Sequence, residues 1–175
     1  KPGEVDAIEA RSRLELMIDR YQRLVLTICY KTTGDYFAAQ DLTQETFLSA
    51  YTHLDTFDGA NEKAWLCRIA ANKCTDYLKS AGRRQIPSQE DSFSCLVSEH
   101  PTPEQQALDR EVRERLLYHC KRLKPPYDEI ARLYFYEERR PDEIARLMGR
   151  NVRTVQTQIY RARNLLRKIY RKECG

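Results

Sequence analysis

The sequence predicts an all-α protein made of two small helical domains joined by a flexible linker. Apolar residues recur at spacings of three and four through most of the chain, and no segment shows the alternation typical of a half-buried strand. Residues 82–103 interrupt this pattern with three prolines and many small polar residues, as linkers do. We therefore expect one domain at residues 1–84, a linker at 85–102 and a second domain at 103–175.

Three helices are expected in the first domain, at about residues 9–31, 36–53 and 64–81. Residues 32–35, Thr-Thr-Gly-Asp, should break the chain between the first two helices. The predicted inward positions are Leu14, Met17, Tyr21, Leu24, Val25, Ile28, Ala39, Leu42, Phe47, Ala50 or Tyr51, Trp65, Ile69, Cys74, Tyr77 and Leu78. Such a set is enough for a small three-to-four-helix bundle.

The second domain should begin with a helix at about residues 103–122, for which Thr102 is the N-cap and Pro103 the first residue. Pro125 and Pro126 end this helix and start another that continues to about residue 136. The last predicted element of the domain is a pair of helices in residues 141–163.

Residues 141–163 predict two amphipathic helices joined by a tight turn. Pro141 suits the first turn of a helix, Gly149 suits the left-handed residue that ends it, and Asn151 is a good N-cap for the next helix. The predicted apolar positions are Ile144, Ala145, Leu147 and Met148, then Val152, Val155, Ile159, Ala162 and Leu166. This pattern predicts a DNA-binding helix-turn-helix, with a solvated helical hairpin as the alternative.

Charge along the chain favours the DNA-binding interpretation. Residues 141–175 contain nine Arg or Lys and three acids, a distribution that attracts a polyanion. The outward side chains of the second helix can bond bases and phosphates. These candidates are Arg153, Thr154, Gln156, Thr157, Gln158, Tyr160, Arg161 and Arg163.

The first domain carries opposite charges on neighbouring helices. Residues 35–62 contain six acids and no Lys or Arg, whereas residues 63–84 contain six bases and one acid. A solvated surface explains either block alone, but the pair suggests two different partners. The outward residues of the basic helix are Arg68, Asn72, Lys73, Asp76, Lys79, Arg83 and Arg84. Phe57 and Trp65 lie beside them in sequence, where aromatic rings can stack on unpaired bases, although Trp65 also suits the core.

Other functional classes find little support in the sequence. Six cysteines without a Cys-x-x-Cys pair, and three distant histidines, give no metal-binding spacing, and we expect no metal or cofactor. No nucleophile and base, and no phosphate loop, points to an enzyme. Without an apolar span or a leader pattern, we expect a cytoplasmic protein with reduced thiols.

Two blocks of sequence resemble one family. Residues 38–51, AAQDLTQETFLSAY, together with residues 57–84 resemble domain 2 of the bacterial RNA polymerase sigma factors of the extracytoplasmic-function class, group IV of the sigma-70 family. Residues 123–167, which include the helix-turn-helix, resemble domain 4. Each block alone is ambiguous, because the helix-turn-helix also resembles those of other bacterial regulators. Both blocks in this order are specific.

The resemblance implies a role for each part of the chain. It places Asp41, Gln44 and Glu45 against the large subunit of core RNA polymerase, and assigns the helix-turn-helix candidates to the minus-thirty-five promoter element. It also implies that a flipped base of the minus-ten element is captured near residues 57–63. The implied minus-ten set is Phe57, Asn61, Lys63, Trp65, Arg68, Asn72, Lys73, Asp76, Lys79, Arg83 and Arg84.

The expected function is therefore that of a promoter-specificity subunit that promotes DNA melting. The family also implies an anti-sigma factor as a regulatory partner. The chain departs from the common family pattern at Arg153, Gln156 and Gln158, and glutamine favours adenine where arginine favours guanine. A stand-alone helix-turn-helix regulator is the alternative function.

Overall fold

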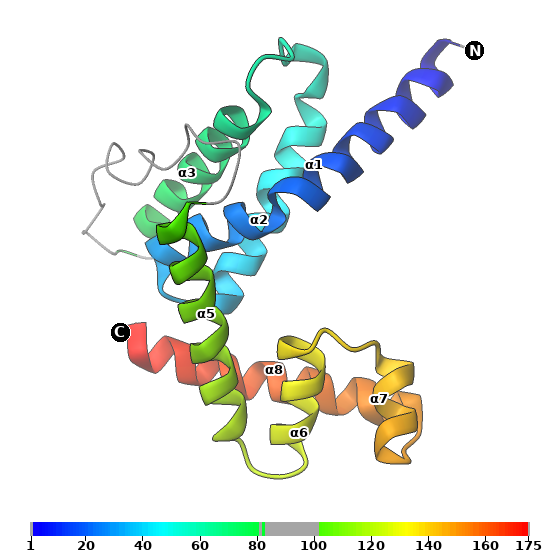
Figure 1. Cartoon of the computed structure of the whole chain (residues 1–175), viewed down its shortest axis with the longest axis vertical. Helices are drawn as coiled ribbons and strands as arrows, with labels where there is room; N and C mark the ends of the chain where they lie inside the picture. Colours follow the sequence, from blue (N-terminus) through cyan, green and yellow to red (C-terminus); the bar gives the residue numbers. More distant parts are fainter. Residues whose placement is uncertain (1, 81, 83–101, 175) are drawn as a thin grey trace. The chain divides into compact units, whose positions relative to one another are not determined.

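The structure, a computed structural model, describes residues 2–80, 82 and 102–174. It divides into two compact units, residues 1–109 and 110–175. The described residues form helices and turns with no β-strand, which confirms the predicted all-α fold (Figure 1). Apart from Thr102, the predicted linker lies outside the described residues, and the predicted domain boundaries stay predictions.

Three helices build the first unit. Helix α1 (Pro2–Thr33), α2 (Tyr36–Thr52) and α3 (Glu62–Ser80) each pack against the other two, and a short 3-10 turn, η1 (Leu54–Thr56), follows α2. The side chains buried between the three helices include Met17, Val25, Cys29, Phe37, Ala39, Leu42, Phe47, Ala50, Leu66, Cys67, Ala70, Cys74 and Leu78. The periodic pattern of the sequence predicted part of this core and missed Cys29, Phe37, Leu66, Cys67 and Ala70, which are also buried.

The junction between α1 and α2 differs from the prediction. Thr32 and Thr33 do not break α1, and the hydroxyl of Thr33 donates to the carbonyl of Cys29, one turn earlier in the helix, at 2.8 Å. The break comes at Gly34, whose φ of +67° is left-handed. The Oδ1 atom of Asp35 then accepts from the backbone N–H of Phe37, at 3.0 Å, and so caps α2.

Some predicted core positions of the first unit are only partly covered. Tyr51 is 43% exposed, and Ala50 fills the alternative core position. Half-buried side chains occupy the remaining predicted positions, at Leu14, Tyr21, Leu24, Ile28, Trp65, Ile69 and Tyr77. A bundle of three helices covers the centre of each apolar stripe and leaves its margins partly open.

The second unit is built around α8. Helix α5 (Pro103–Lys121) crosses the division between the units, and α6 (Tyr127–Ala131) follows and continues into a π-type turn, η3 (Arg132–Tyr136). Helices α6 and α7 (Pro141–Met148) both pack against α8 (Val152–Cys174) (Figure 1). The buried side chains include Val112, Leu116, Cys120, Leu123, Ile130, Leu133, Phe135, Ile144, Ala145, Val155, Ile159, Ala162, Leu166 and Tyr170.

Two predicted core residues of the helix-turn-helix are exposed. Val152 is 39% exposed because it is the first residue of α8, beyond the part of the helix that its neighbours cover. Leu147 is 64% exposed and Met148 is half-buried, so only Ile144 and Ala145 carry the packing of the short helix α7. Spacing alone assigned to the core the residues on either side of the turn, where little packing surface exists.

The described part of the chain contains four buried cysteines. Cys29, Cys67, Cys74 and Cys120 are buried free thiols, and Cys174 is partly exposed. Burial raises the pKa of Cys67 and of Cys120 to about 12. Within residues 2–80 and 102–174, no helix combines the length and the apolar character that crossing a membrane requires.

Candidate nucleic-acid interfaces

The turn between α7 and α8 has the geometry that the sequence predicted. Gly149 adopts φ +61° and ψ +39°, and the next N–H, that of Arg150, donates to the carbonyl of Ala145 at 2.9 Å. The Oδ1 atom of Asn151 accepts from the backbone N–H of Arg153, at 2.8 Å. The two helices are thus joined by a residue that ends one and a residue that caps the other.

Helix α8 has one buried face and one polar face. Most of the predicted minus-thirty-five residues are exposed, namely Arg153, Thr154, Gln156, Thr157, Tyr160 and Arg161. Gln158 and Arg163 are half-buried at the edge of the packed face. The Oε1 atom of Gln158 accepts from Nη1 of Arg150, at 2.9 Å, and the guanidinium of Arg163 lies over the Phe135 ring. These two side chains therefore already make contacts within the unit.

The contact of Arg163 is with an aromatic ring of its own unit. Its guanidinium carbon lies over the Phe135 ring, 5.6 Å from the ring centre. Cations at this range are attracted by the ring face. Arg163 thus contacts a buried ring of the core as well as lying at the edge of the polar face of α8.

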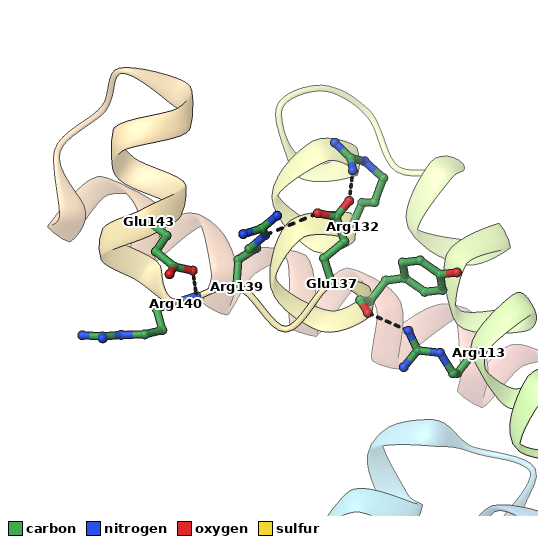
Figure 2. Close-up of polar contacts among 7 residues, drawn as sticks. Arg113, Arg132, Glu137, Arg139, Arg140 and Glu143 are labelled. Carbon is green, nitrogen blue, oxygen red and sulfur yellow. Dashed lines mark hydrogen bonds and ion pairs between the residues drawn. The ribbon is translucent and has the colours of Figure 1, made fainter.

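A cluster of charged residues orients the chain as it enters α7, and Figure 2 shows how these side chains meet. The carboxylate of Glu137 pairs with Arg132 and with Arg139, whose Nε lies 3.6 Å from Oε2. At the start of α7, the backbone N–H of Arg140 donates to Oε2 of Glu143, at 3.2 Å (Figure 2). Sequence reasoning did not select this cluster, because a run of acids and arginines gives no sign of which pairs will form.

The π-type turn is fixed to α5 as well. The Nη2 atom of Arg113 donates to the carbonyl of Tyr136, at 3.2 Å, and its guanidinium carbon lies 4.8 Å from the centre of the Tyr136 ring (Figure 2). Glu138, which follows the turn, has a left-handed φ of +56°. The direction in which α7 leaves this turn is therefore set by several contacts within the second unit.

Helix α3 of the first unit carries a polar stripe. Arg68, Asn72, Asp76 and Lys79 are all exposed, and their spacing of four, four and three places them on one face. Lys63 and Lys73 are half-buried. The structure thus brings Arg68, Asn72, Asp76 and Lys79, four of the predicted minus-ten residues, onto one exposed face. Arg83 and Arg84 lie outside the described residues.

The aromatic pair beside α3 is engaged within the unit. The rings of Phe57 and Trp65 stack on each other, with 4.2 Å between their centres and 15° between their planes. Asn61, with a φ of +46°, accepts at Oδ1 from the backbone N–H of Ala64, at 3.1 Å, and so caps α3. Both rings are half-buried, which leaves each only partly accessible to a base.

The acidic face of α2 is a separate surface of the first unit. Asp41, Gln44 and Glu45 are all exposed, and Asp41 lies one helical turn before the other two. Leu48 continues the same face at the next turn and is 65% exposed. Sequence reasoning missed Leu48, although its spacing of four from Gln44 was the available signal.

The fold and these surfaces define a helical DNA-binding protein with a helix-turn-helix and a second polar helix. Comparison with known proteins makes this more specific. Residues 17–84 match the family described as Sigma-70 region 2, and residues 120–166 match Sigma-70, region 4. The chain therefore belongs to the sigma-70 family, and within it to the extracytoplasmic-function (ECF) RNA polymerase sigma factors, the transcription initiation factors that give the polymerase its promoter specificity.

Several relatives are similar over most of this chain. The ECF sigma factor SigW of Bacillus subtilis (strain 168) is 29% identical, and the match covers 96% of this chain and 91% of SigW. The ECF sigma-E factor of Escherichia coli (strain K12) is 31% identical over 86% of this chain and 83% of its own length. A solved structure of the RsbN–BldN complex covers 95% of this chain and 97% of the matched chain, at 26% identity and a TM-score of 0.44.

Proposed function

We propose that this sigma factor binds core RNA polymerase through α2 and contacts two promoter elements through α8 and α3. The observation that carries the proposal is the separation of three exposed polar surfaces, each on its own helix. One is acidic, with Asp41 and Glu45, and the other two carry amides among basic residues. An acidic face suits a protein partner, whereas basic faces with amides suit DNA.

Helix α8 would recognise the minus-thirty-five element in the major groove. The groove is wide enough for one helix, and each base pair presents there a distinct set of donors and acceptors. Gln156 offers the donor and acceptor pair that matches adenine, and Arg153, at the start of the helix, offers a guanidinium for guanine or for phosphate. The same N-terminal turns of a recognition helix contact bases in other helix-turn-helix proteins.

The stripe on α3 and the 57–61 loop would hold a flipped base of the minus-ten element. Extruding a base costs a few kcal/mol, which binding to the single-stranded form offsets. Asn72 can bond a base edge, and Arg68 and Lys79 can neutralise phosphates on either side. Melting would follow from this preference for unpaired DNA, and the chain itself would carry out no covalent chemistry.

We further propose that the protein acts in the cytoplasm and that an anti-sigma factor covers its polymerase-binding or DNA-binding surfaces when transcription is not required. Both proposals rest on family membership. Affinity purification of the full chain from its native cells, under several growth conditions, tests the proposed anti-sigma factor. Recovery of polymerase subunits alone under every condition would contradict it.

Run-off transcription with core polymerase on a library of promoter sequences tests the main proposal. We expect transcripts only from promoters with defined bases in both elements. Reversing the charge of Asp41 or Glu45 should weaken polymerase binding, whereas Asp19→Lys, an exposed acid of α1, should not. Asn72→Ala should leave polymerase binding intact and reduce open-complex formation. Equal loss of polymerase affinity in the Asp41 and Asn72 variants would contradict the assignment of separate surfaces.

A further inference from the structure

One arginine of α1 contacts both ends of the 57–61 loop. The Nη2 and Nε atoms of Arg13 lie 3.3 Å and 3.4 Å from Oε1 of Glu62, the first residue of α3. Its guanidinium carbon lies 5.4 Å from the centre of the Phe57 ring, at the start of the loop. The segment between these two contacts is therefore spanned by a single side chain from a neighbouring helix.

The two contacts reach residues that are themselves fixed. Phe57 stacks on Trp65 of α3, and Glu62 belongs to the first turn of that helix. Arg13 and Glu62 are partly covered, with 40% and 25% of their side chains exposed. A single ion pair or cation–π contact at such exposure stabilises only weakly, but both contacts here depend on one guanidinium. Removing it would release both ends of the loop together.

The residues between these contacts form an exposed turn, and a β-carbon at Gly59 would lie 3.9 Å from Nη2 of Arg13. Residues 58–61 are exposed, and the Oδ1 atom of Asp58 accepts from the backbone N–H of Ala60, at 2.9 Å. Gly59 and Asn61 both have left-handed φ values, +81° and +46°. Glycine and asparagine are the residues that adopt this region most readily, so the sequence of the turn suits its conformation.

We propose that Arg13 is a positioning residue for base capture, which holds the 57–61 loop in the conformation that accepts an unpaired minus-ten base. Arg13 contributes through Phe57 and Glu62 and makes no base contact of its own. The inference rests on the proposed function of this loop. It adds a residue of α1 to the determinants of promoter choice.

The test compares promoter selectivity of holoenzymes that contain the wild-type chain, Arg13→Gln, Glu62→Gln or Arg11→Gln. Selectivity is the ratio of open-complex formation on a cognate promoter to that on promoters with one changed minus-ten base. We expect Arg13→Gln to reduce this ratio about fivefold, as expected for the loss of two weak contacts, with polymerase affinity unchanged. Arg11 is the matched control, because it lies on the same helix and pairs with Glu15, one turn away.

Glu62→Gln separates positioning from simple electrostatics. Removal of an acid strengthens non-specific binding to a polyanion, so an electrostatic role for Arg13 and Glu62 predicts opposite effects for the two variants. A positioning role predicts that both variants lose selectivity. It also predicts that Arg13→Lys, which keeps the charge, has a selectivity between those of Arg13→Gln and the wild type. Trp65 is the one tryptophan of the chain and gives a direct readout of the loop. If the stacking of Phe57 on Trp65 weakens, the fluorescence emission of Trp65 should shift in both variants, measured without DNA.

The outcomes distinguish the inference from the function on which it rests. If wild-type holoenzyme shows no dependence on minus-ten bases, the proposed function fails. If the wild type is selective and Arg13→Gln matches Arg11→Gln in selectivity and in Trp65 emission, Arg13 does not position the loop. Far-UV circular dichroism checks that each variant is folded, and a global loss of helix in Arg13→Gln with full selectivity in Glu62→Gln would also overturn the inference.

Discussion

The imidazole of His119 lies against the carboxylate of Glu173, with 3.0 Å between Nε2 and Oε2, although His119 is fully buried. The ring also packs against Tyr170, at 4.8 Å between ring centres. Burial lowers the pKa of His119, and this effect outweighs the opposing influence of Glu173; Arg115 and Arg122 lower it further. Folding of the second unit therefore favours the neutral imidazole of His119.

This arrangement predicts that the second unit loses stability as the pH falls below 7. A histidine whose pKa is lowered by folding binds protons more readily in the unfolded chain, so acid favours unfolding once the pH falls through its unfolded value of about 6.5. His119→Gln should reduce the loss between pH 7 and pH 5. Thermal unfolding of both proteins, followed by circular dichroism at the two pH values, measures the difference. An equal decrease in melting temperature would exclude His119 as the cause.

Glu173 also makes the stability of the second unit depend on pH, in a more acidic range than His119. Its burial disfavours the ionised form, but the hydrogen bond from Arg115, at 3.0 Å, and the nearby His119 outweigh this and lower the pKa of the carboxyl group. A lowered pKa contributes stability above the unfolded value of about 4.3, and this is lost as the pH falls through the folded pKa. The histidine and the glutamate thus affect stability in adjacent pH ranges.

Gln156 and Gln158 should differ in their influence on promoter choice. Gln156 is exposed, whereas Gln158 is half-buried and bonded to Arg150. We expect Gln156→Ala to reduce discrimination at one base pair of the minus-thirty-five element by about 1–3 kcal/mol, and Gln158→Ala to have a smaller effect. Binding of holoenzyme to promoters with single base changes measures both. A larger effect of Gln158→Ala would show that its bond to Arg150 breaks on binding.

The difference between these glutamines also shows what the sequence could and could not predict. Helical periodicity predicted the helices and part of the core, because burial on one face imposes that spacing directly. It placed both glutamines on the outward face alike. The bond between Gln158 and Arg150 depends on the turn between them, whose side-chain contacts no periodic pattern specifies.

Helix ends and loops account for several of the errors. Leu147 and Val152 follow the apolar pattern but lie near the end of α7 and at the start of α8, where packing depends on the neighbours available. The stacking of Phe57 on Trp65 and the contacts of Arg13 likewise join segments that are distant in sequence. Residue types indicated the chemistry of the candidate site, and tertiary contacts decided which side chains remain exposed.

Two adjacent leucines of α8 provide a direct test of the packing. Leu166 is fully buried and Leu165 is 37% exposed. Leu166→Ala should lower the free energy of unfolding by about 2–5 kcal/mol, because it leaves a cavity in the core, whereas Leu165→Ala should cost about 1 kcal/mol or less. Urea unfolding followed by circular dichroism compares the two variants. Equal costs would mean that α8 does not present the face described here to the core.

Gly149 should be required for its backbone conformation and not for lack of space. A β-carbon at this position would meet no atom within 4 Å, yet the φ of +61° is unfavourable for most side chains. We expect Gly149→Ala to destabilise the second unit by about 1 kcal/mol and Gly149→Asn to cost less, because asparagine tolerates the left-handed region. Chemical unfolding of the two variants measures the order. If alanine were tolerated as well as asparagine, the turn would have changed conformation, and weaker binding to the minus-thirty-five element should accompany that change.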